Sequence, residues 1–171
     1  MANTPPTEAA VRNAAEQRAS AIANRDPLFT AWAEASIGKP CLVRTVEGQP
    51  SYWSVPVEFE SRTIGFVRVT QGGKAVAAGV LYRDPTKLET APRTVTGISS
   101  EEALRCISDE VGSDDVVGHP IYVHDGPPGR EAWMIPVSQH DGSARILFVT
   151  SSGWYERSSD ELSEPPSDLE G

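Results

Sequence analysis

Basic residues are scarce in this chain: 15 Lys and Arg stand against 24 Asp and Glu, for a formal net charge of −9. Phosphate backbones and acidic membrane surfaces both attract clustered positive charge, and the sequence shows no basic stripe. Nucleic acid and membrane surfaces are therefore not expected as partners. Long apolar runs are also missing, since no stretch approaches the ~20 residues that cross a bilayer. The first residues lack the basic and apolar regions of a signal peptide, so we expect a cytoplasmic protein.

Cysteine is nearly absent, with Cys41 and Cys106 as the two occurrences. In a cytoplasmic chain both thiols are expected to be reduced and buried, and a disulfide between them is the alternative. A metal or redox site needs closer or more numerous ligands. The G-x-S-x-G, H-E-x-x-H, C-x-x-C and phosphate-loop motifs are missing too. We therefore expect no cofactor, no metal and no catalytic residue.

The two ends of the chain differ from the rest in composition. Residues 1–6 are short and polar, and from Glu156 to Gly171 six acids stand against Arg157, a net charge of −5. Segments with few apolar residues and high charge density do not offset the entropy lost on ordering. We expect disorder in residues 1–6 and in an acidic tail from 157 to 171, which leaves residues 1–155 mildly acidic.

An internal repeat with an offset of 80 residues is the most informative pattern. GKPCLVRTVEGQPSYWSVPV, from Gly38, aligns without a gap with GHPIYVHDGPPGREAWMIPV, from Gly118, and the register continues to Gly73 and Gly153. Nine of the 36 aligned pairs are identical, where residue usage gives about two by chance. The identical pairs are Gly38/Gly118, Pro40/Pro120, Val43/Val123, Trp53/Trp133, Pro56/Pro136, Val57/Val137, Val69/Val149, Thr70/Thr150 and Gly73/Gly153.

The pattern predicts an α+β fold of two tandem repeats, each a helix followed by an antiparallel β-meander. The first repeat spans residues 7–82 and includes an extra N-terminal helix at about 8–23; a linker follows at 83–98, and the second repeat spans 99–156. Apolar patterning predicts strands at 41–46, 51–60, 63–70, 75–82, 121–124, 131–139 and 144–150, with period-two alternation at 51–60 and 131–139.

Capping signals predict where the other helices begin. Asp26 followed by Pro27 starts an apolar helical stripe that runs to Ile37, and Ser99 with Glu102 forms a capping box for a helix to Val111. Pro56 and Pro136 interrupt good strands at equivalent positions. Because proline donates no ladder hydrogen bond, each is expected at a bulge or on an exposed edge.

A helix followed by a meander that carries W-x-[VI]-P-V resembles the PepSY-like and cystatin-like α+β modules. The motif stands at Trp53 to Val57 and at Trp133 to Val137, and the resemblance covers about residues 27–82 and 99–156. Such modules typically bind or inhibit other proteins, often peptidases, so the resemblance implies a binding role.

The three histidines, His119, His124 and His140, all lie in the second repeat. His124 beside Asp125, and His140 beside Asp141, suggest a base with a partner. Neighbours on a strand point to opposite faces, however, and do not readily bond side chain to side chain. Surface histidines are the simpler interpretation.

We therefore predict a non-catalytic binding or regulatory module, inhibitor-like in kind, that engages an unknown protein or peptide through an exposed strand edge or the groove between repeats. The expected partner-binding residues are aromatic: Tyr52, Trp53, Trp133, Trp154 and Tyr155. Trp53 and Trp133 are equally explained as core residues. The alternatives are a small enzyme or ligand-binding protein with a pocket near His124 and His140, and a structural subunit of a larger assembly. The oligomeric state is left open.

Overall fold

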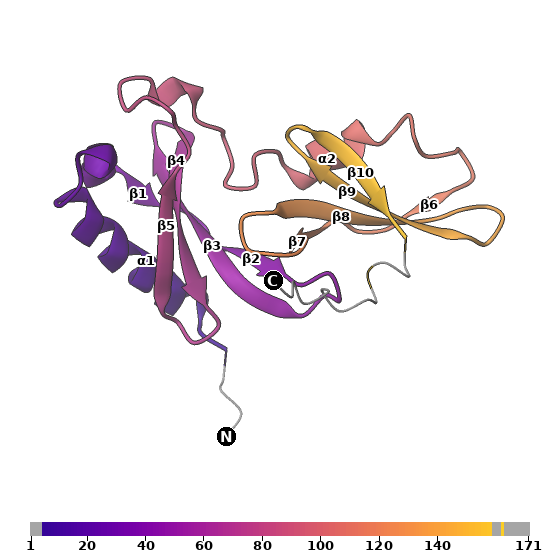
Figure 1. Ribbon diagram of the computed structural model, residues 1–171, viewed down its shortest axis with the longest axis horizontal. Helices are drawn as coiled ribbons and strands as arrows, with labels where there is room; N and C mark the ends of the chain where they lie inside the picture. The colour runs from indigo at the N-terminus through magenta and orange to yellow at the C-terminus, as the bar shows by residue number, and fades with distance from the viewer. Residues whose placement is uncertain (1–4, 159–161, 163–171) are drawn as a thin grey trace, which may run out of the picture. The chain divides into compact units, whose positions relative to one another are not determined.

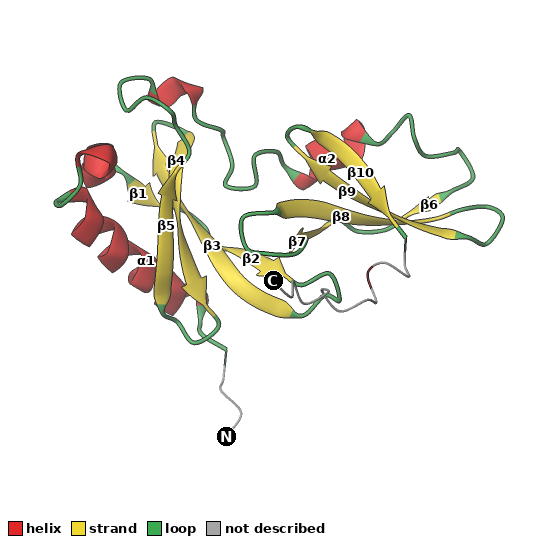
Figure 2. Cartoon of the chain, in the orientation of Figure 1, coloured by secondary structure: helices red, strands yellow, loops and turns green. Residues whose placement is uncertain are grey.

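A computed structural model describes residues 5–158 and Leu162 (Figure 1). The fold is mixed α+β (Figure 2). The chain divides into two compact units: unit 1 contains Met1–Val43 and Pro50–Gly97, and unit 2 contains Arg44–Gln49 and Ile98–Gly171. No helix of the described chain combines the length and apolar character that a membrane span needs.

Unit 1 begins with helix α1, Glu8–Ala23, whose bounds match the prediction. Thr7 caps it by accepting a hydrogen bond from the backbone N–H of Ala10, and Val11, Ala15 and Ala19 form its buried face. The next helix, η1, is a 3₁₀ helix at Pro27–Glu34 rather than an α-helix reaching Ile37. The predicted Asp26 cap is confirmed, because its carboxylate accepts from the N–H of Leu28 at 2.9 Å.

The strands of unit 1 lie in the order β2-β3-β4-β5, and β1 pairs with β3. The β3–β4 and β4–β5 pairs are antiparallel. Pro56 lies directly before a register shift at Val57/Glu58, close to the predicted bulge. The 3₁₀ helix η2, Leu88–Thr90, lies in the predicted linker. The strands are β1 (Ser36–Ile37), β2 (Cys41–Arg44), β3 (Pro50–Phe59), β4 (Arg62–Thr70) and β5 (Ala75–Val80).

The core of unit 1 forms where α1 and η1 pack on this sheet. Trp32, only 4% exposed, belongs to this core. A Cβ atom on Gly65 of β4 would lie 2.3 Å from Cζ2 of Trp32 and 2.7 Å from the carbonyl oxygen of Gly79. Glycine at position 65 therefore makes the room that the indole ring occupies.

Unit 2 contains an antiparallel run of strands in the order β7-β8-β9-β10, and β6 pairs with β8. Arg44, the last residue of β2, pairs in parallel with Val123 of β7. A turn at Asp141-Gly142 joins β8 to β9, and the N–H of Gln139 donates to the carbonyl of Ser143 across it. The strands are β6 (Val116–Val117), β7 (Ile121–His124), β8 (Glu131–Ser138), β9 (Ala144–Thr150) and β10 (Gly153–Arg157).

The two faces of the unit 2 sheet bury different clusters. Helix α2, Ser100–Cys106, packs on one face against the cluster that includes Leu147 and Val149 (Figure 2). The predicted Ser99–Glu102 capping box is confirmed, but α2 ends at Cys106, well before Val111. We call the face of the sheet on which α2 packs the α2 face. The opposite face holds Val123, Ala132, Met134 and Phe148, with Leu162 packed against them.

Three strands differ from the sequence expectation. The sequence predicts no strand at 153–157, yet β10 lies there, and Arg157 belongs to it rather than to the tail. Strands β1 and β6 were not predicted either. Predicted disorder at residues 1–4, 159–161 and 163–171 lies outside the described residues.

Candidate binding edge at strand β10

The aromatic residues predicted to bind a partner fall into two groups. Tyr52 is 5% exposed, and the guanidinium carbon of Arg68 lies 4.6 Å from the centre of its ring. Trp53 packs partly buried against the unit 1 core. Trp133 is also partly buried, and its Nε1–H donates to the carbonyl of Ile98 at 3.0 Å. These three side chains serve the fold and offer little surface to a partner.

Trp154 and Tyr155 form the second group, because both remain open on strand β10. Their exposed fractions are 36% and 38%, the highest of the Trp, Tyr and Phe side chains, although four aliphatic side chains are more exposed. Four of the five residues of β10, Gly153 to Glu156, are exposed. The structure thus brings two of the predicted anchors together on one short strand.

The turn before β10 explains where this strand starts. Thr150 of β9 pairs with Gly153, and two serines lie between them. The Thr150 hydroxyl donates to the carbonyl of Gly153 at 3.2 Å and accepts from the N–H of Ser152 at 3.2 Å. Gly153 has φ of +136°, a conformation that side chains rarely adopt. The turn therefore requires glycine immediately before the two aromatic residues.

Alternation along β10 places its two aromatic rings on opposite faces of the sheet. Trp154 lies opposite Val149, on the α2 face. Tyr155 lies opposite Phe148 on the other face, and the two rings stack with centroids 5.2 Å apart and planes within 7°. The edge thus presents one aromatic side chain on each face.

A buried carboxylate that follows strand β7, three strands away in the sheet, holds β10 in place. Asp125 follows β7 and is 4% exposed. Its Oδ2 accepts a 2.7 Å hydrogen bond from the Tyr155 hydroxyl, and its Oδ1 pairs with the Arg157 guanidinium. Burial, together with the hydrogen bond to Asp125, raises the pKa of Tyr155 to about 12. The phenol therefore stays protonated and remains a donor at neutral pH.

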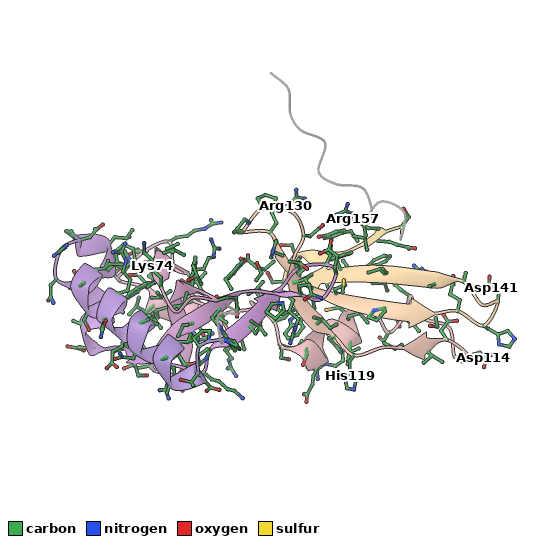
Figure 3. The ribbon with its side chains drawn as sticks, turned by 90° about the horizontal axis from the view of Figure 1, so that it is seen from below. Lys74, Asp114, His119, Arg130, Asp141 and Arg157 are labelled. Atoms are coloured by element: carbon green, nitrogen blue, oxygen red, sulfur yellow. The ribbon has the colours of Figure 1, made fainter. Side chains whose placement is uncertain are left out.

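The other charged residues of the edge are also paired. Arg145 of β9 donates to Glu156 at 2.9 Å and to the backbone carbonyl of Glu110 at 3.2 Å. Figure 3 shows Arg130 and Arg157 on the same side of unit 2, and both lie close enough to Tyr155 to lower its pKa slightly. These contacts orient the edge strand.

Sequence reasoning missed the role of Asp125 and Arg157. Asp125 was considered only as a partner for His124, and Arg157 was assigned to the tail. Their equivalents under the 80-residue offset are Thr45 and Ala77, so the repeat carries no sign of the contact. Proximity across three strands is a tertiary feature that local patterns do not encode.

The outer edge of β10, on the side away from β9, is the remaining feature of this strand. It pairs with β9 and, within residues 5–158, with no other strand. An edge strand presents backbone N–H and C=O groups that can pair with another extended segment. The combination of this edge and the two exposed rings defines the candidate site, which we call the β10 edge (Gly153–Arg157).

The two histidines of the alternative pocket lie far apart. His124 pairs with Glu131 at the start of β8, and His140 lies two residues beyond the end of that strand. Eight strand residues span roughly 25 Å. In Figure 3, Asp141, next to His140, lies at the opposite end of unit 2 from Arg130. The histidines therefore do not share a pocket.

Their local bonds are to backbone groups and a loop carboxylate. His124 Nδ1 lies 2.6 Å from the carbonyl oxygen of Gly126, and the backbone N–H of His140 donates to Asp115 at 3.2 Å. Cys41 and Cys106 are both free thiols, and burial raises the pKa of Cys41 to about 11. Among the described residues, no three His, Cys, Asp or Glu side chains gather as metal ligands.

A groove of about 750 Å³ runs along α1 in unit 1. Polar α1 side chains line one wall, and Trp32 and Ile37 contribute to the other. Arg12 reaches from the helix to the carbonyl of Ile37, at 2.9 Å. None of the five predicted binding residues lines this groove, so it does not coincide with the β10 edge.

Comparison of the chain with protein-family models, curated proteins and solved structures returned no match.

Proposed function

We propose that this protein is a non-catalytic binding module that takes an extended segment of a partner protein onto the β10 edge. The observation that carries the proposal is the position of Trp154 and Tyr155, both exposed on a strand that is paired on one side. Aromatic residues dominate binding energy at protein interfaces. Backbone pairing with an added strand supplies affinity that does not depend on the partner's sequence.

The anchoring of β10 supports this role. An added strand gains most when the receiving strand is already ordered, because ordering costs are then small. The Asp125 contacts with Tyr155 and Arg157 order β10 before a partner arrives. Asp125, Tyr155 and Arg157 are thus engaged with one another in holding the strand, which favours a binding role for them over a catalytic one.

We also keep the tandem duplication as part of the proposal, and strand registers support it. Several pairs in unit 1 recur in unit 2 with both numbers raised by 80. The bond from the N–H of Gly38 to the carbonyl of Pro56, 2.9 Å, likewise matches that from Gly118 to Pro136, 2.8 Å. The recurring pairs are Ser36–Glu58 with Val116–Ser138, Trp53–Val69 with Trp133–Val149, Val55–Val67 with Ile135–Leu147, and Pro56–Phe66 with Pro136–Ile146.

The duplicated edges then differ in a way that favours β10. Strand β5, the corresponding last strand of unit 1, reads AVAAGV and carries no aromatic residue. Its most exposed apolar side chain is Val76. The resemblance to PepSY-like and cystatin-like modules agrees with a binding role but stays a prediction, as does a cytoplasmic location.

Selection of peptides tests the proposal. A displayed random peptide library is selected on the immobilised full chain, and selected peptides are measured by fluorescence polarisation. Trp154→Ala should weaken binding by at least about tenfold, because truncating an aromatic anchor typically costs ~2 kcal/mol. Hydrogen exchange should show new protection of the β10 backbone amides on binding.

The matched control is Val76→Ala, which removes exposed apolar surface from the edge strand of the other unit. It should change affinity less than about twofold, and circular dichroism should show that both variants are folded. Peptides that bind the Trp154 variant as well as the parent chain, with protection elsewhere, would show that the β10 edge is not the site.

A further inference from the structure

The groove along α1 has the size of a ligand site. Its volume is about 750 Å³, and small-molecule sites typically measure ~300–1,000 Å³. All of its lining residues belong to unit 1: α1 and its cap Asn24 form one wall, and residues 32–37 with Val57 form the other. Alanines contribute to both walls: Ala9, Ala19, Ala23, Ala33 and Ala35. Because their methyl groups are short, the space between the walls stays open to a small molecule.

Two opposite charges line the groove one turn apart on α1. Arg12 and Glu16 are the charged residues of the lining, and both side chains are exposed. Side chains four residues apart on a helix are neighbours, yet neither residue forms an ion pair within the described chain. Arg12 precedes Glu16, which is the weaker of the two orders for such a pair. Its guanidinium instead donates to the carbonyl of Ile37, on the other wall, at 2.9 Å.

The contact between Arg12 and Ile37 leaves both charges open to a ligand. It uses one of the five N–H donors of the guanidinium, and the Glu16 carboxylate accepts no hydrogen bond from the described residues. A free α-amino acid carries its ammonium and carboxylate groups on one carbon, so it can meet both charges at once. Carboxylate and guanidinium also match in geometry. A peptide holds its charged ends farther apart, by up to ~3.6 Å for each added residue.

The rest of the lining is uncharged. Ile37 is half-buried there, and Trp32 and Val57 add apolar surface from the same wall. Ligand sites typically combine an apolar lining with a few polar groups that fix the orientation of the ligand. A third charge on the ligand would find no opposite charge in this lining, so the side chain of the ligand is expected to be apolar.

We infer that unit 1 binds a free α-amino acid with an apolar side chain in the groove along α1. The ligand carboxylate lies against Arg12, the ammonium group against Glu16, and the side chain against Ile37 and the alanines. None of these residues belongs to the β10 edge, so the inference goes beyond the proposed function and does not depend on it.

The probe is L-phenylalanine, titrated into the full chain labelled with ¹⁵N. Amide chemical shifts are followed by NMR at about pH 6.5, where α-amino groups are protonated. The amides of α1, η1 and β1 should shift together, and those of unit 2 should not. Exposed ion pairs are individually weak, so we expect a dissociation constant on the order of 1 mM.

Three analogues test the chemistry of the ligand. L-Phenylalaninamide lacks the carboxylate and N-acetyl-L-phenylalanine lacks the ammonium group, and each should bind about threefold more weakly, the effect of losing one exposed ion pair. L-Alanine keeps both charges without the ring. It should bind about fivefold more weakly, because burial of even half of an aromatic ring is worth a factor of that size.

Two variants assign the charges. Arg12→Gln should bind L-phenylalanine and its amide alike, while it still distinguishes the N-acetyl compound; Glu16→Gln should show the reverse pattern. The matched controls are Arg18→Gln, on the same helix, and Glu60→Gln, which remove the same charges from exposed positions outside the groove. They should change each affinity by less than about twofold, because exposed charges farther away are screened. Circular dichroism should show all four variants folded, since glutamine is a good helix former.

The possible outcomes decide the inference without bearing on the β10 edge. Absence of shifts with L-phenylalanine, or shifts that lie outside α1, η1 and β1, would overturn the site. Analogues that bind as tightly as L-phenylalanine, or an Arg12 variant that behaves like the Arg18 control, would overturn recognition of a zwitterion and with it the inference. Peptide selection tests the proposed function separately, through residues that the groove does not contain.

Discussion

At the scale of single residues, Asp125 shows how one buried carboxylate can hold an edge strand. It accepts from Tyr155 and Arg157, which lie on the same face of β10 two residues apart. Removing it leaves a phenol and a guanidinium without that acceptor. Substitution of Asp125 therefore tests how much this contact contributes to the stability of the fold.

Asp125→Ala should lower the free energy of unfolding by about 1–3 kcal/mol, the usual cost of leaving buried donors unsatisfied. Asp125→Asn should cost less, because the amide oxygen still accepts from Tyr155. Urea denaturation measures both. The control is Asp109→Ala, an exposed aspartate, which should stay within about 0.5 kcal/mol. Equal stability of the Asp125→Ala variant and the parent chain would show that the contact contributes nothing to the fold.

Cys41 and Cys106 should react at very different rates with iodoacetamide. Burial raises the pKa of Cys41 from 9.0 to about 11, whereas Cys106 is exposed. At pH 8 only about one Cys41 side chain in a thousand is thiolate, the reactive form. Mass spectrometry should therefore find Cys106 modified first. In a Cys106→Ser variant, labelling of Cys41 should become fast only in urea; fast native labelling would contradict its burial.

The same shift predicts how stability depends on alkaline pH. Between about pH 9 and 11 the folded chain keeps the Cys41 proton while the unfolded chain releases it, so stability falls as pH rises through this range. Cys41→Ala should make the fall shallower in urea titrations at pH 8, 9.5 and 10.5. An unchanged slope would mean that Cys41 titrates alike in both states.

At the scale of elements, a glycine packed on a proline recurs in both units. A Cβ atom on Gly118 would lie 2.6 Å from Cγ of Pro136. One on Gly38 would lie 2.8 Å from Cγ of Pro56 and 2.5 Å from the carboxylate of Glu58. The short strands β6 and β1 end directly before these glycines. The repeated Gly and Pro of the sequence are therefore explained by one close contact that lets each short strand join β8 or β3.

Gly118→Ala and Gly38→Ala should each destabilise the chain by about 1–3 kcal/mol, the usual cost of overpacking. Gly72→Ala is the control, because its Cβ would approach no atom closer than 3.7 Å. Thermal unfolding measures all three. Two stable variants would show that β1 and β6 shift easily to admit a methyl group.

Elements were predictable from the sequence where local patterns act. Apolar patterning predicted β3, β4, β8 and β9 to within a residue or two, and capping residues predicted where η1 and α2 begin. Strand β10 was missed, although the fourth strand of the first repeat pointed to one after Gly153. Its apolar pair Trp154-Tyr155 is too short to show a period, and its stability comes from β9 and Asp125, contacts that lie outside the local sequence.

At the scale of the whole molecule, the distribution of charge differs from the one inferred from the sequence. The total of −9 was divided into a tail and a mildly acidic body. The boundaries of the units show instead that the negative charge belongs to unit 2. The segment Arg44–Gln49, which the fold assigns to unit 2, carries one base and one acid, so a cut at the end of the predicted linker gives the same division of charge from the sequence alone.

This asymmetry predicts a response of stability to salt. Repulsion among the acids of unit 2 opposes the folded state, and added ions screen it. The ion pairs that salt would weaken are Arg145–Glu156, which is exposed, and Arg157–Asp125, whose buried acid is screened less. The melting temperature should therefore rise by a few degrees between about 20 and 200 mM NaCl. A variant with Asp160→Asn, Glu161→Gln, Glu164→Gln, Asp168→Asn and Glu170→Gln should show a smaller rise than the parent chain. A control variant of unit 1, with Glu8→Gln, Glu16→Gln, Glu34→Gln, Glu60→Gln and Glu89→Gln, should show the same rise as the parent, since it leaves the net charge of unit 2 intact. A melting temperature that falls with salt would show that attractive pairs, and not repulsion, dominate the electrostatics of this fold.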